Sequence, residues 1–367
     1  MRVGLHVGQL HQSVPGGIGR YVRGLLSGLA APELRDEVAV VPFAAGPRPR
    51  DPDGLLDAYV DLGRPHGSLR YELWHRLRRP VIDLGVDVVH APSLAVPPAG
   101  TTPLVVTVHD VAFLRHPEAF TRRGVSFHRR GLELAYRDAA VVITASEFAR
   151  TELERAGFES NRLHLAPHGV TRPDPEPDDV VDTRVRRMGV TQPFVLAVGT
   201  VEPRKGLDVL AAAFTQAREH VPDLTLAVVG PRGWLAVPGL DAPGIRELGS
   251  VDERTLDALY RRATVCAVPS RYEGFGLPAL EALARGCPVI ASATTSLPEV
   301  VGDAGRLVPP RDVETWAQAL VDLVTDADAR ADLARRGAQR AREFTWTRSA
   351  AAHLEAYRAA TAAIARP

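Results

Sequence analysis

Residues 264–293, TVCAVPSRYEGFGLPALEALARGCPVIASA, predict one strand–helix–strand unit and thereby the class of fold. The apolar runs TVCAVPS (264–270) and PVIASA (288–293) have the length and composition of strands that are buried on both faces. Between them lies GLPALEALARG (276–286), in which Pro278 is a residue favoured in the first turn of a helix. Two strands joined by a helix indicate a parallel βαβ unit.

The same alternation of short apolar strands and helical segments runs through most of the chain. In the second half, strands are predicted at FVLAVGT (194–200), LTLAVVG (224–230) and IRELG (245–249). In the first half, helices are predicted at 68–85 and 123–139. We therefore expect parallel sheets covered by helices. The strands predicted in the first half are VGLHV (3–7), VAVVPF (38–43), VDVVHA (86–91), PLVVTVHD (103–110) and AVVITAS (140–146).

A polar stretch divides the two halves. The segment HGVTRPDPEPDDVVD (168–182) is rich in proline and aspartate, which is typical of a linker. We place a first Rossmann-like domain at 1–175 and a second at 176–345. The predicted fold class is α/β, with two doubly wound domains facing a cleft. Ligands of such sheets bind beyond the carboxyl ends of the strands, so we expect a ligand in this cleft.

The composition excludes several classes of protein. Lys and Arg number 44, and Asp and Glu also number 44, so the formal net charge is zero and nucleic acid is not an expected partner. Cys266 and Cys287 lie in apolar runs without the spacing of metal ligands, which fits a reducing compartment. No apolar run reaches the roughly 18 residues of a membrane span, and MRVGLHVGQL (1–10) lacks the pattern of a signal peptide. We expect a cytoplasmic protein.

The loop inside the opening stretch combines two carboxylates with glycines. Gly276, Leu277 and the start of the following helix would present backbone N–H groups to an anion such as a phosphate. Glu273 precedes this loop and would reach hydroxyls on the molecule that carries the phosphate. Glu281, in the first turns of the helix, would accept a hydrogen bond from a further hydroxyl. The alternative is that Glu281 only complements the helix dipole, and the residues alone leave both interpretations open.

Residues 271–278, RYEGFGLP, together with Glu281, resemble the E-x7-E signature of the retaining GT-B glycosyltransferases of family 4. The resemblance extends over nearly the whole chain, because other signatures of the family follow in order. It implies that Glu273 contacts hydroxyls of the donor sugar and that Glu281 contacts the ribose of the nucleotide. The donor site that it implies also includes Gly274, Phe275, Gly276, Leu277 and, in the nucleotide-base loop ELGSVDE (247–253), backbone atoms near Val251.

The segment VGTVEPRKGLDVLAAAF (198–214) places two cations just before a helix. Arg204 and Lys205 would neutralise a diphosphate at the carboxyl end of a strand, and a solvated basic turn is the alternative. The segment resembles the G-x5-K-G segment of the same family, in which Arg and Lys bind the donor phosphates and stabilise the leaving nucleotide. This resemblance makes Arg204 and Lys205 the expected electrostatic catalysts.

The loop PGGIGRY (15–21) joins the first strand to the first helix. A glycine turn after a first strand is a weak signal by itself. In the resembled family this loop lies against the donor phosphates and the acceptor, which implicates Gly16 and Gly17. Arg20 would neutralise an anionic acceptor or pack at the start of the helix.

Polar residues also end other strands of the first half. His109 and Asp110 follow the apolar strand in TVHDVAF (107–113), and the resembled family commonly places a histidine here, near the donor sugar. His109 is therefore a further catalytic candidate, and a hydrogen-bonding residue at the rim is the alternative. Asp110 would orient the ring of His109, although neighbouring side chains on a strand point apart. Ser146 and His168 end later strands, and we expect them on the acceptor side with Asp110.

We expect no metal site. The D-x-D pairs Asp51–Asp53 and Asp326–Asp328 do not follow apolar strands, so we interpret both as solvated turns or helix caps. Arg204, Lys205 and the helix start would take the place of a metal ion. We expect no cofactor, because the nucleotide sugar acts as a co-substrate.

The resemblance implies a retaining, metal-independent hexosyltransferase that acts in the synthesis of a glycan or glycoconjugate. The segment TVHDVAFLRHPEAF (107–120) is similar to sequences common among bacterial mannosyltransferases. GDP-mannose is therefore the first donor that we expect, and UDP- and dTDP-sugars stay open. The acceptor would be a glycan, a lipid-linked sugar or a small molecule. The closing helix, 346–367, is similar to a segment that returns to the first domain in this fold.

Other interpretations stay open. A nucleotide-sugar epimerase would need no acceptor, a phosphorylase would need inorganic phosphate, and a non-catalytic partner of another transferase would only bind a nucleotide sugar. Arg122, Arg123, Arg129 and Arg130 form a basic patch that would suit peripheral contact with the inner face of a membrane. A solvated helix face is the alternative for this patch.

Overall fold

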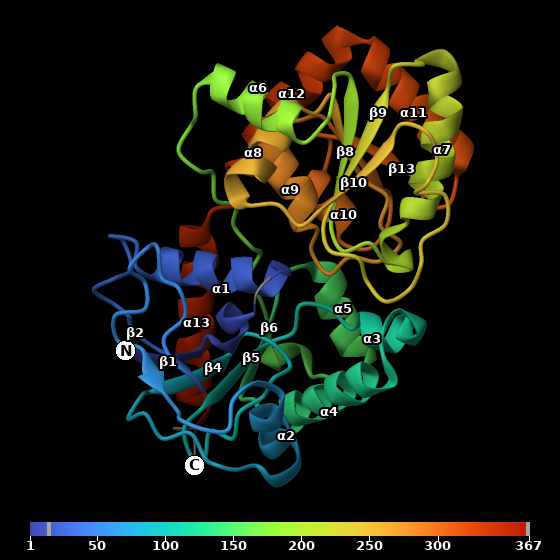
Figure 1. The fold of residues 1–367 in the computed structure, drawn as a ribbon. Coiled ribbons are helices and arrows are strands. Elements are labelled where there is room, and N and C mark those ends of the chain that lie inside the picture. Colours follow the sequence, from blue (N-terminus) through green and yellow to red (C-terminus); the bar gives the residue numbers. More distant parts are fainter. Residues whose placement is uncertain (13–15, 365–367) are drawn as a thin grey trace. The chain divides into compact units, whose positions relative to one another are not determined.

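The chain folds into two compact domains in a computed structural model that describes residues 1–12 and 16–364. The first domain comprises Met1–Gly169 and Phe344–Pro367, and the second comprises Val170–Glu343 (Figure 1). The boundaries expected from the sequence, after residues 175 and 345, lie slightly further along the chain.

The first domain is built on one parallel sheet. Its described strands are β1 (Arg2–His6), β2 (Ala39–Ala44), β3 (Val60–Asp61), β4 (Val88–Ala91), β5 (Leu104–Thr107), β6 (Val141–Thr144) and β7 (Leu163–Leu165). They lie in the order β3-β2-β1-β4-β5-β6-β7. The inner strands β4, β5 and β6 are buried along their whole length, which explains their uninterrupted apolar sequences.

Helices cover both faces of this sheet, as Figure 1 shows. They are α1 (Gly16–Leu29), α2 (Gly67–Leu77), α3 (Ala112–Arg115), α4 (Arg122–Asp138), α5 (Glu147–Arg155) and α13 (Trp346–Ile364), with 3-10 turns η1 (Gly8–His11), η2 (Pro117–Ala119) and η3 (Ser160–Arg162). On one face α1 packs beside α13, where Tyr21 and Trp346 join the core. On the other face α2, α4 and α5 enclose a second core that contains Trp74.

The second domain repeats this plan, and all of its residues are described. Its strands are β8 (Phe194–Val198), β9 (Thr225–Val229), β10 (Ile245–Gly249), β11 (Val265–Val268), β12 (Val289–Ser292) and β13 (Arg306–Val308). They form one parallel sheet in the order β10-β9-β8-β11-β12-β13. Its helices are α6 (Asp178–Arg187), α7 (Leu207–His220), α8 (Glu253–Arg262), α9 (Leu277–Ala284), α10 (Leu297–Val301), α11 (Val313–Thr325) and α12 (Ala327–Ala341), with a 3-10 turn η4 (Pro203–Lys205).

Both sheets are doubly wound. In each, the chain starts in the middle, moves to one edge, and then returns to build the other half. The order therefore reverses between β1 and β4 in the first domain and between β8 and β11 in the second. The predicted class of two doubly wound α/β domains is confirmed. Ligands of such folds bind at this point of reversal, beyond the carboxyl ends of the strands, so each domain has one expected ligand site.

The sequence prediction was wrong in a few places. The helix expected over 68–85 ends at Leu77, and Arg78 adopts a left-handed conformation with φ of 50°. Pro80 explains this end, because proline cannot continue a helix and restricts the residue before it. Three strands were not predicted, β3, β7 and β13. Each has only two or three residues and lies at the edge of a sheet, so none produces a long apolar run.

Within residues 1–12 and 16–364, no helix combines the length and apolarity needed to cross a membrane.

Candidate active site

A buried ion pair lies at the point of reversal in the second domain. Lys205 follows β8 and Glu273 follows β11, two strands that pair side by side. The Lys205 ammonium donates a hydrogen bond of 2.6 Å to Oε1 of Glu273, and the Ser270 hydroxyl donates one of 2.8 Å to the same oxygen. Ser270 and Lys205 also line a narrow hollow at the carboxyl ends of these strands. Two residues predicted separately from the sequence therefore form one charged unit.

The backbone brings these two loops together. Gly206 has a φ of 66°, and a Cβ built on it would lie 2.0 Å from the carbonyl oxygen of Pro269. Only glycine therefore allows η4 to approach the end of β11 so closely. The N–H of Arg271 donates to the carbonyl of Arg204 at 2.9 Å, and a guanidinium N–H of Arg204 donates to the carbonyl of Tyr272 at 2.9 Å. These bonds hold both cations beside Glu273.

Arg204 connects a second carboxylate to the pair. Its Nε and Nη2 donate to Oε1 of Glu202 at 3.0 and 2.6 Å, and its Nη1 lies 3.9 Å from Oε2 of Glu273. The half-buried group thus contains two cations, Arg204 and Lys205, and two carboxylates. A diphosphate that enters this place would compete with the carboxylates for both cations.

Glu273 is ionised in this setting. Its burial by itself would raise the pKa of the carboxyl group. The charges of Lys205 and, to a lesser extent, of Arg204 lower the pKa, and the hydrogen bonds from Lys205 and Ser270 lower it further. Together they outweigh burial, so the pKa lies below its usual value. The negative charge of Glu273 in turn stabilises the two cations in a site that excludes most water.

The loop after Glu273 is clamped before α9 begins. The N–H of Glu273 donates to Oγ1 of Thr295 at 3.2 Å, and the Ser296 hydroxyl donates to the carbonyl of Glu273 at 2.9 Å. Thr295 has a φ of 57°, a left-handed conformation that is rare for a β-branched residue and indicates local strain. Gly276 caps α9 with a φ of 102°, and a Cβ there would lie 2.7 Å from Leu297. The predicted helix start therefore exists, preceded by Gly274 and the buried Phe275.

Glu281 lies in α9 and is buried, with 8% of its surface exposed. Its Oε2 accepts a hydrogen bond of 3.0 Å from the hydroxyl of Tyr260 on α8. The guanidinium of Arg285 stacks over the Tyr260 ring and pairs with Asp257 at 2.6 Å, which holds the tyrosine in place. The carboxylate of Glu281 is thus oriented by a side chain from another helix. Val251 lies in the loop between β10 and α8, just before the helix that carries Tyr260.

In the first domain, His109 follows β5 and is hydrogen-bonded through both ring nitrogens. Nε2 lies 2.9 Å from the carbonyl oxygen of Pro92, and Nδ1 lies 3.2 Å from Nε2 of the buried His168. Asp110 does not orient this ring, which corrects the sequence prediction. Its Oδ1 instead accepts the N–H of Ala112 at 2.9 Å, an Asx turn in the loop before α3. Neighbouring side chains on a strand point apart, which explains why Asp110 does not reach the ring.

The other candidates of the first domain lie at helix starts. Ser146 is buried and accepts the N–H of Ala149 at 3.1 Å, so its hydroxyl caps α5. Gly16 and Gly17 begin α1, and Gly16 has a φ of 64° with open space around its Cα. Arg20 is exposed on the same helix. The preceding residues of the loop, 13–15, lie outside the described residues.

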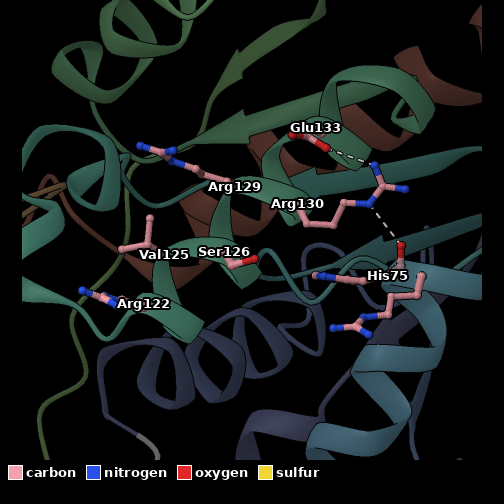
Figure 2. A pocket seen from close by; sticks show the side chains of 8 residues that line it. His75, Arg122, Val125, Ser126, Arg129, Arg130 and Glu133 are labelled. Atoms are coloured by element: carbon pink, nitrogen blue, oxygen red, sulfur yellow. Dashed lines mark hydrogen bonds and ion pairs between the residues drawn. The ribbon is translucent and has the colours of Figure 1, made fainter.

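A groove of about 640 Å³ lies between α2 and α4 of the first domain. Figure 2 shows Arg122, Val125 and Arg129 along α4, with Arg130 reaching toward α2. Arg130 donates to the carbonyl of His75 at 3.1 Å and pairs with Glu133 at 3.0 Å. Three of the four arginines of the predicted basic patch, Arg122, Arg129 and Arg130, therefore line a groove, and the charge of Arg130 is partly neutralised by Glu133.

The D-x-D pairs take part in turns and caps. Asp51 accepts the N–H groups of Leu55 and Leu56, each at 2.8 Å, and Asp326 caps α12 through the N–H of Ala329. Across the residues that the structure describes, no group of three or more His, Cys, Asp or Glu side chains is arranged to hold a metal ion.

Three residues of the second-domain site were missed by the sequence prediction. Ser270 ends the predicted strand TVCAVPS, so its position at the carboxyl edge was a usable signal. Tyr260 is one of several residues on the buried side of α8, and Thr295 lies in a loop. Neither has a local pattern that points to a glutamate, because their contacts depend on how α8, α9 and β12 pack.

Comparisons with known proteins identify the family of the chain. Residues 15–172 match the family model described as Glycosyltransferase Family 4, and residues 192–326 match that described as Glycosyl transferases group 1. The chain is 32% identical over 305 residues to the O-antigen chain mannosyltransferase B of Escherichia coli, covering 78% of this chain and 79% of that protein. It is 39% identical over 283 residues to a D-inositol 3-phosphate glycosyltransferase of Xylanimonas cellulosilytica, covering 71% and 67%.

Solved structures share the fold. The sucrose-phosphate synthase of Thermosynechococcus elongatus superposes with a TM-score of 0.75 at 23% identity, covering 98% of both chains. WaaG, a glycosyltransferase involved in lipopolysaccharide biosynthesis, superposes with a TM-score of 0.68 at 17% identity, covering 95% of this chain and 98% of that one.

Proposed function

Because the chain belongs to glycosyltransferase family 4 and is a glycosyltransferase of GT-B architecture, we propose that it transfers a hexose from a nucleotide sugar to a hydroxyl acceptor. The transfer would retain the configuration at the anomeric carbon. The product would be part of a glycan or glycoconjugate. The observation that carries this proposal is the buried pair of Lys205 and Glu273, with Arg204 beside it, at the point of reversal of the second sheet.

This group suits a donor with a diphosphate. Without ligand, the charges of Arg204 and Lys205 are balanced by Glu202 and Glu273. When the bond to the sugar breaks, negative charge grows on the leaving diphosphate. Cations that are already fixed by hydrogen bonds stabilise that charge without having to reorganise, which is where electrostatic catalysis is most effective. The first backbone N–H groups of α9, after Gly276, would add positive potential at the same phosphates.

Glu273 and Glu281 would orient the two sugars of the donor. The Glu273 carboxylate is ionised and therefore accepts hydrogen bonds from hydroxyls of the hexose. Glu281, held by Tyr260, would accept from the ribose. Phe275, Leu277 and backbone atoms near Val251 would enclose the nucleotide. These roles are supported by the position of Val251, Glu273, Phe275 and Leu277 in segments that follow strands of one sheet, and by the position of Glu281 on the helix that starts from one of these segments.

The proposed reaction is a displacement on one face of the sugar. The acceptor oxygen forms a bond to the anomeric carbon while the bond from that carbon to the diphosphate oxygen breaks. The proton of the acceptor hydroxyl passes to the departing phosphate oxygen, so no protein base and no covalent sugar are required. We also propose that no metal or cofactor takes part, because Arg204 and Lys205 supply the positive charge.

The donor is proposed to be GDP-mannose. The E. coli relative, at 32% identity, is a mannosyltransferase, which supports this choice. The relatives named D-inositol 3-phosphate glycosyltransferase keep other donors open, including UDP- and dTDP-sugars. They also favour a small acceptor as an alternative to a glycan or a lipid-linked sugar. Peripheral contact with the inner membrane face through the basic groove remains part of the proposal, and binding to anionic vesicles would test it.

A thermal-shift series with GDP-mannose, UDP-glucose, UDP-N-acetylglucosamine and a dTDP-sugar, each measured with and without EDTA, tests the function. We expect one donor to raise the melting temperature of the wild type and to have little effect on Glu273→Ala. An equal response of the mutant would remove Glu273 from the donor site. A response that disappears with EDTA would contradict metal independence, and the absence of any response would contradict the proposed donor class.

A further inference from the structure

A buried chain of hydrogen bonds runs through the first domain from its last helix. His353 and Tyr357 lie on α13, Tyr21 on α1, His90 on β4 and Thr107 on β5. The Tyr21 hydroxyl lies 2.7 Å from Nε2 of His353 and 2.8 Å from Oγ1 of Thr107. His90 connects Oγ1 of Thr107, at 2.8 Å from its Nε2, to the Tyr357 hydroxyl, at 2.9 Å from its Nδ1. All five side chains are buried.

The direction of every hydrogen bond in this chain follows from the bond that His353 makes to a backbone carbonyl at one end of it. Nδ1 of His353 lies 2.7 Å from the carbonyl oxygen of Ser349, which can only accept, so Nδ1 carries the proton. Burial lowers the pKa of His353 to about 4, so the ring is neutral and its Nε2 accepts from Tyr21. Tyr21 then accepts from Thr107, and Thr107 accepts from Nε2–H of His90. Nδ1 of His90 finally accepts from Tyr357.

The position of α13 against α1 is fixed by close packing. A Cβ on Gly24 would lie 2.0 Å from the Trp346 ring, and one on Gly28 would lie 2.2 Å from the Trp346 carbonyl oxygen. Because these two glycines of α1 have no side chain, the start of α13 can pack directly against α1, and only in one register. That register places His353 opposite Tyr21, so the hydrogen bond between them depends on the helix pair as a whole.

The ring of Tyr21 is the link to the predicted site. It packs edge-on against His109, with 4.8 Å between ring centroids and an interplanar angle of 83°. It also lies 4.7 Å from the ring of His168, which bonds to Nδ1 of His109. The bond to the Pro92 carbonyl requires a proton on Nε2 of His109, so Nδ1 accepts from Nε2–H of His168. The Tyr21 ring therefore packs against the rings of both His109 and His168.

We propose that His353 of α13 is a positioning residue for His109 and acts through Tyr21. His353 holds the Tyr21 hydroxyl, the Tyr21 ring sets the position of the His109 and His168 rings, and the C-terminal helix is thereby part of the catalytic apparatus. The effect on catalysis rests on the proposed role of His109 in sugar transfer. The effect on the ring of His109 does not depend on that role.

Two variants at position 353 separate positioning from packing. His353→Gln keeps an oxygen that can accept from Tyr21, whereas His353→Met fills similar space without a comparable acceptor. We expect His353→Met to lower kcat for sugar transfer about tenfold, and His353→Gln to restore most of it. The affinity for the nucleoside diphosphate should stay unchanged in both variants, because neither variant alters Arg204, Lys205 or the start of α9, which would bind most of its phosphate charge. Equal kcat in both variants and the wild type would overturn the proposal.

Nitrogen NMR of the histidine rings tests the same chain without any activity. In the wild type we expect a proton on Nδ1 of His353 and on Nε2 of His90, His109 and His168. His353→Met should shift the ring signals of His109, and His353→Gln should shift them less. Unchanged His109 signals in His353→Met would overturn the positioning role even if the enzyme transfers sugar. If no donor of the panel is turned over, the proposed function fails, but the shifted signals would still support the positioning role.

Discussion

The two domains share a strand order but have opposite chemistry at their points of reversal. In the second domain the carboxyl ends of β8 and β11 carry Lys205 and Glu273, a buried ion pair with Arg204 alongside. In the first domain, β4, β5, α1 and α13 instead bury a chain of neutral histidine, tyrosine and threonine side chains. The ion pair of the second domain thus lies at the carboxyl ends of its strands, whereas this buried chain of the first domain is uncharged.

This difference fits the two partners of the proposed reaction. A diphosphate leaving group needs fixed positive charge, and the second domain holds it ready. The attacking group of the acceptor is a neutral hydroxyl, and a buried unpaired charge beside it would only add a desolvation cost. The same fold therefore serves two kinds of ligand, because the residues after the strands differ while the sheets do not.

The largest effect is expected from Glu273→Gln, which removes the charge that balances Lys205. We expect kcat/KM for sugar transfer to fall on the order of 10²–10³-fold, the usual cost of losing one electrostatic contact at the reacting centre. We also expect the free energy of unfolding of the second domain to fall by about 3 kcal/mol, because a buried cation loses its partner. Steady-state kinetics and urea unfolding measure both. Activity close to wild type would contradict the charged site.

Lys205→Met tests the same pair from the other side. The charge of Lys205 is the strongest effect that opposes burial at Glu273, so its loss should raise the pKa of that carboxyl group. We expect kcat to fall on the order of 10²-fold, with a smaller fall for Lys205→Arg, which keeps the charge. The pH dependence of kcat/KM, measured for wild type and both variants, should show a new acidic group in Lys205→Met alone. Its absence would contradict the coupling of these two residues.

Acid should weaken the first domain before the second. The pKa of His353 is lowered to about 4 by burial, while an unfolded histidine has a pKa of about 6.5. Between these values the unfolded chain binds the extra proton, so stability is full above about pH 6.5 and is lost as the pH falls. One such residue costs about 2 kcal/mol between pH 7 and pH 5. The pKa values of His90 and His168 are lowered in the same way by burial.

The second domain behaves differently in this range. His220 is its one histidine, and that side chain is exposed. The pKa of Glu273 is lowered, so its contribution persists at pH 5 and is lost only as the pH falls below the usual carboxyl range. Hydrogen exchange at pH 7 and pH 5 should therefore show reduced protection in β4, β5 and α13, with β8 and β11 unchanged. Equal loss in both sheets would contradict the comparison.

The smallest effect is expected from Tyr260→Phe. The change removes the hydroxyl that donates to Glu281 and leaves the ring under Arg285. We expect a loss of about 1 kcal/mol in the free energy of unfolding and a several-fold rise in KM for the donor, with kcat nearly constant. Tyr136→Phe is the matched control, because that ring is exposed on α4. A change in kcat larger than that in KM would contradict a role in ribose binding.

Much of the fold and part of the site could be predicted from local sequence. The buried inner strands have apolar runs that a parallel sheet requires, so β4, β5, β8 and β11 were all expected. Glu273, Glu281, Arg204 and Lys205 belong to motifs that local order alone makes recognisable. Edge strands such as β13 and the end of α2 were not predicted correctly, because short edge strands have little apolar pattern and Pro80 overrides the helical periodicity.

The sequence by itself determined the fold class, the family and the identity of the charged residues, because these depend on residue types within short segments. The tertiary structure decided which residues meet. It paired Lys205 with Glu273 and Glu281 with Tyr260, placed Asp110 in a turn before α3, and brought His353 to Tyr21 across more than 300 positions of the chain. The physical reason is that hydrogen bonds and ion pairs depend on distances of a few ångströms between elements, and those distances are set by packing rather than by neighbouring residues.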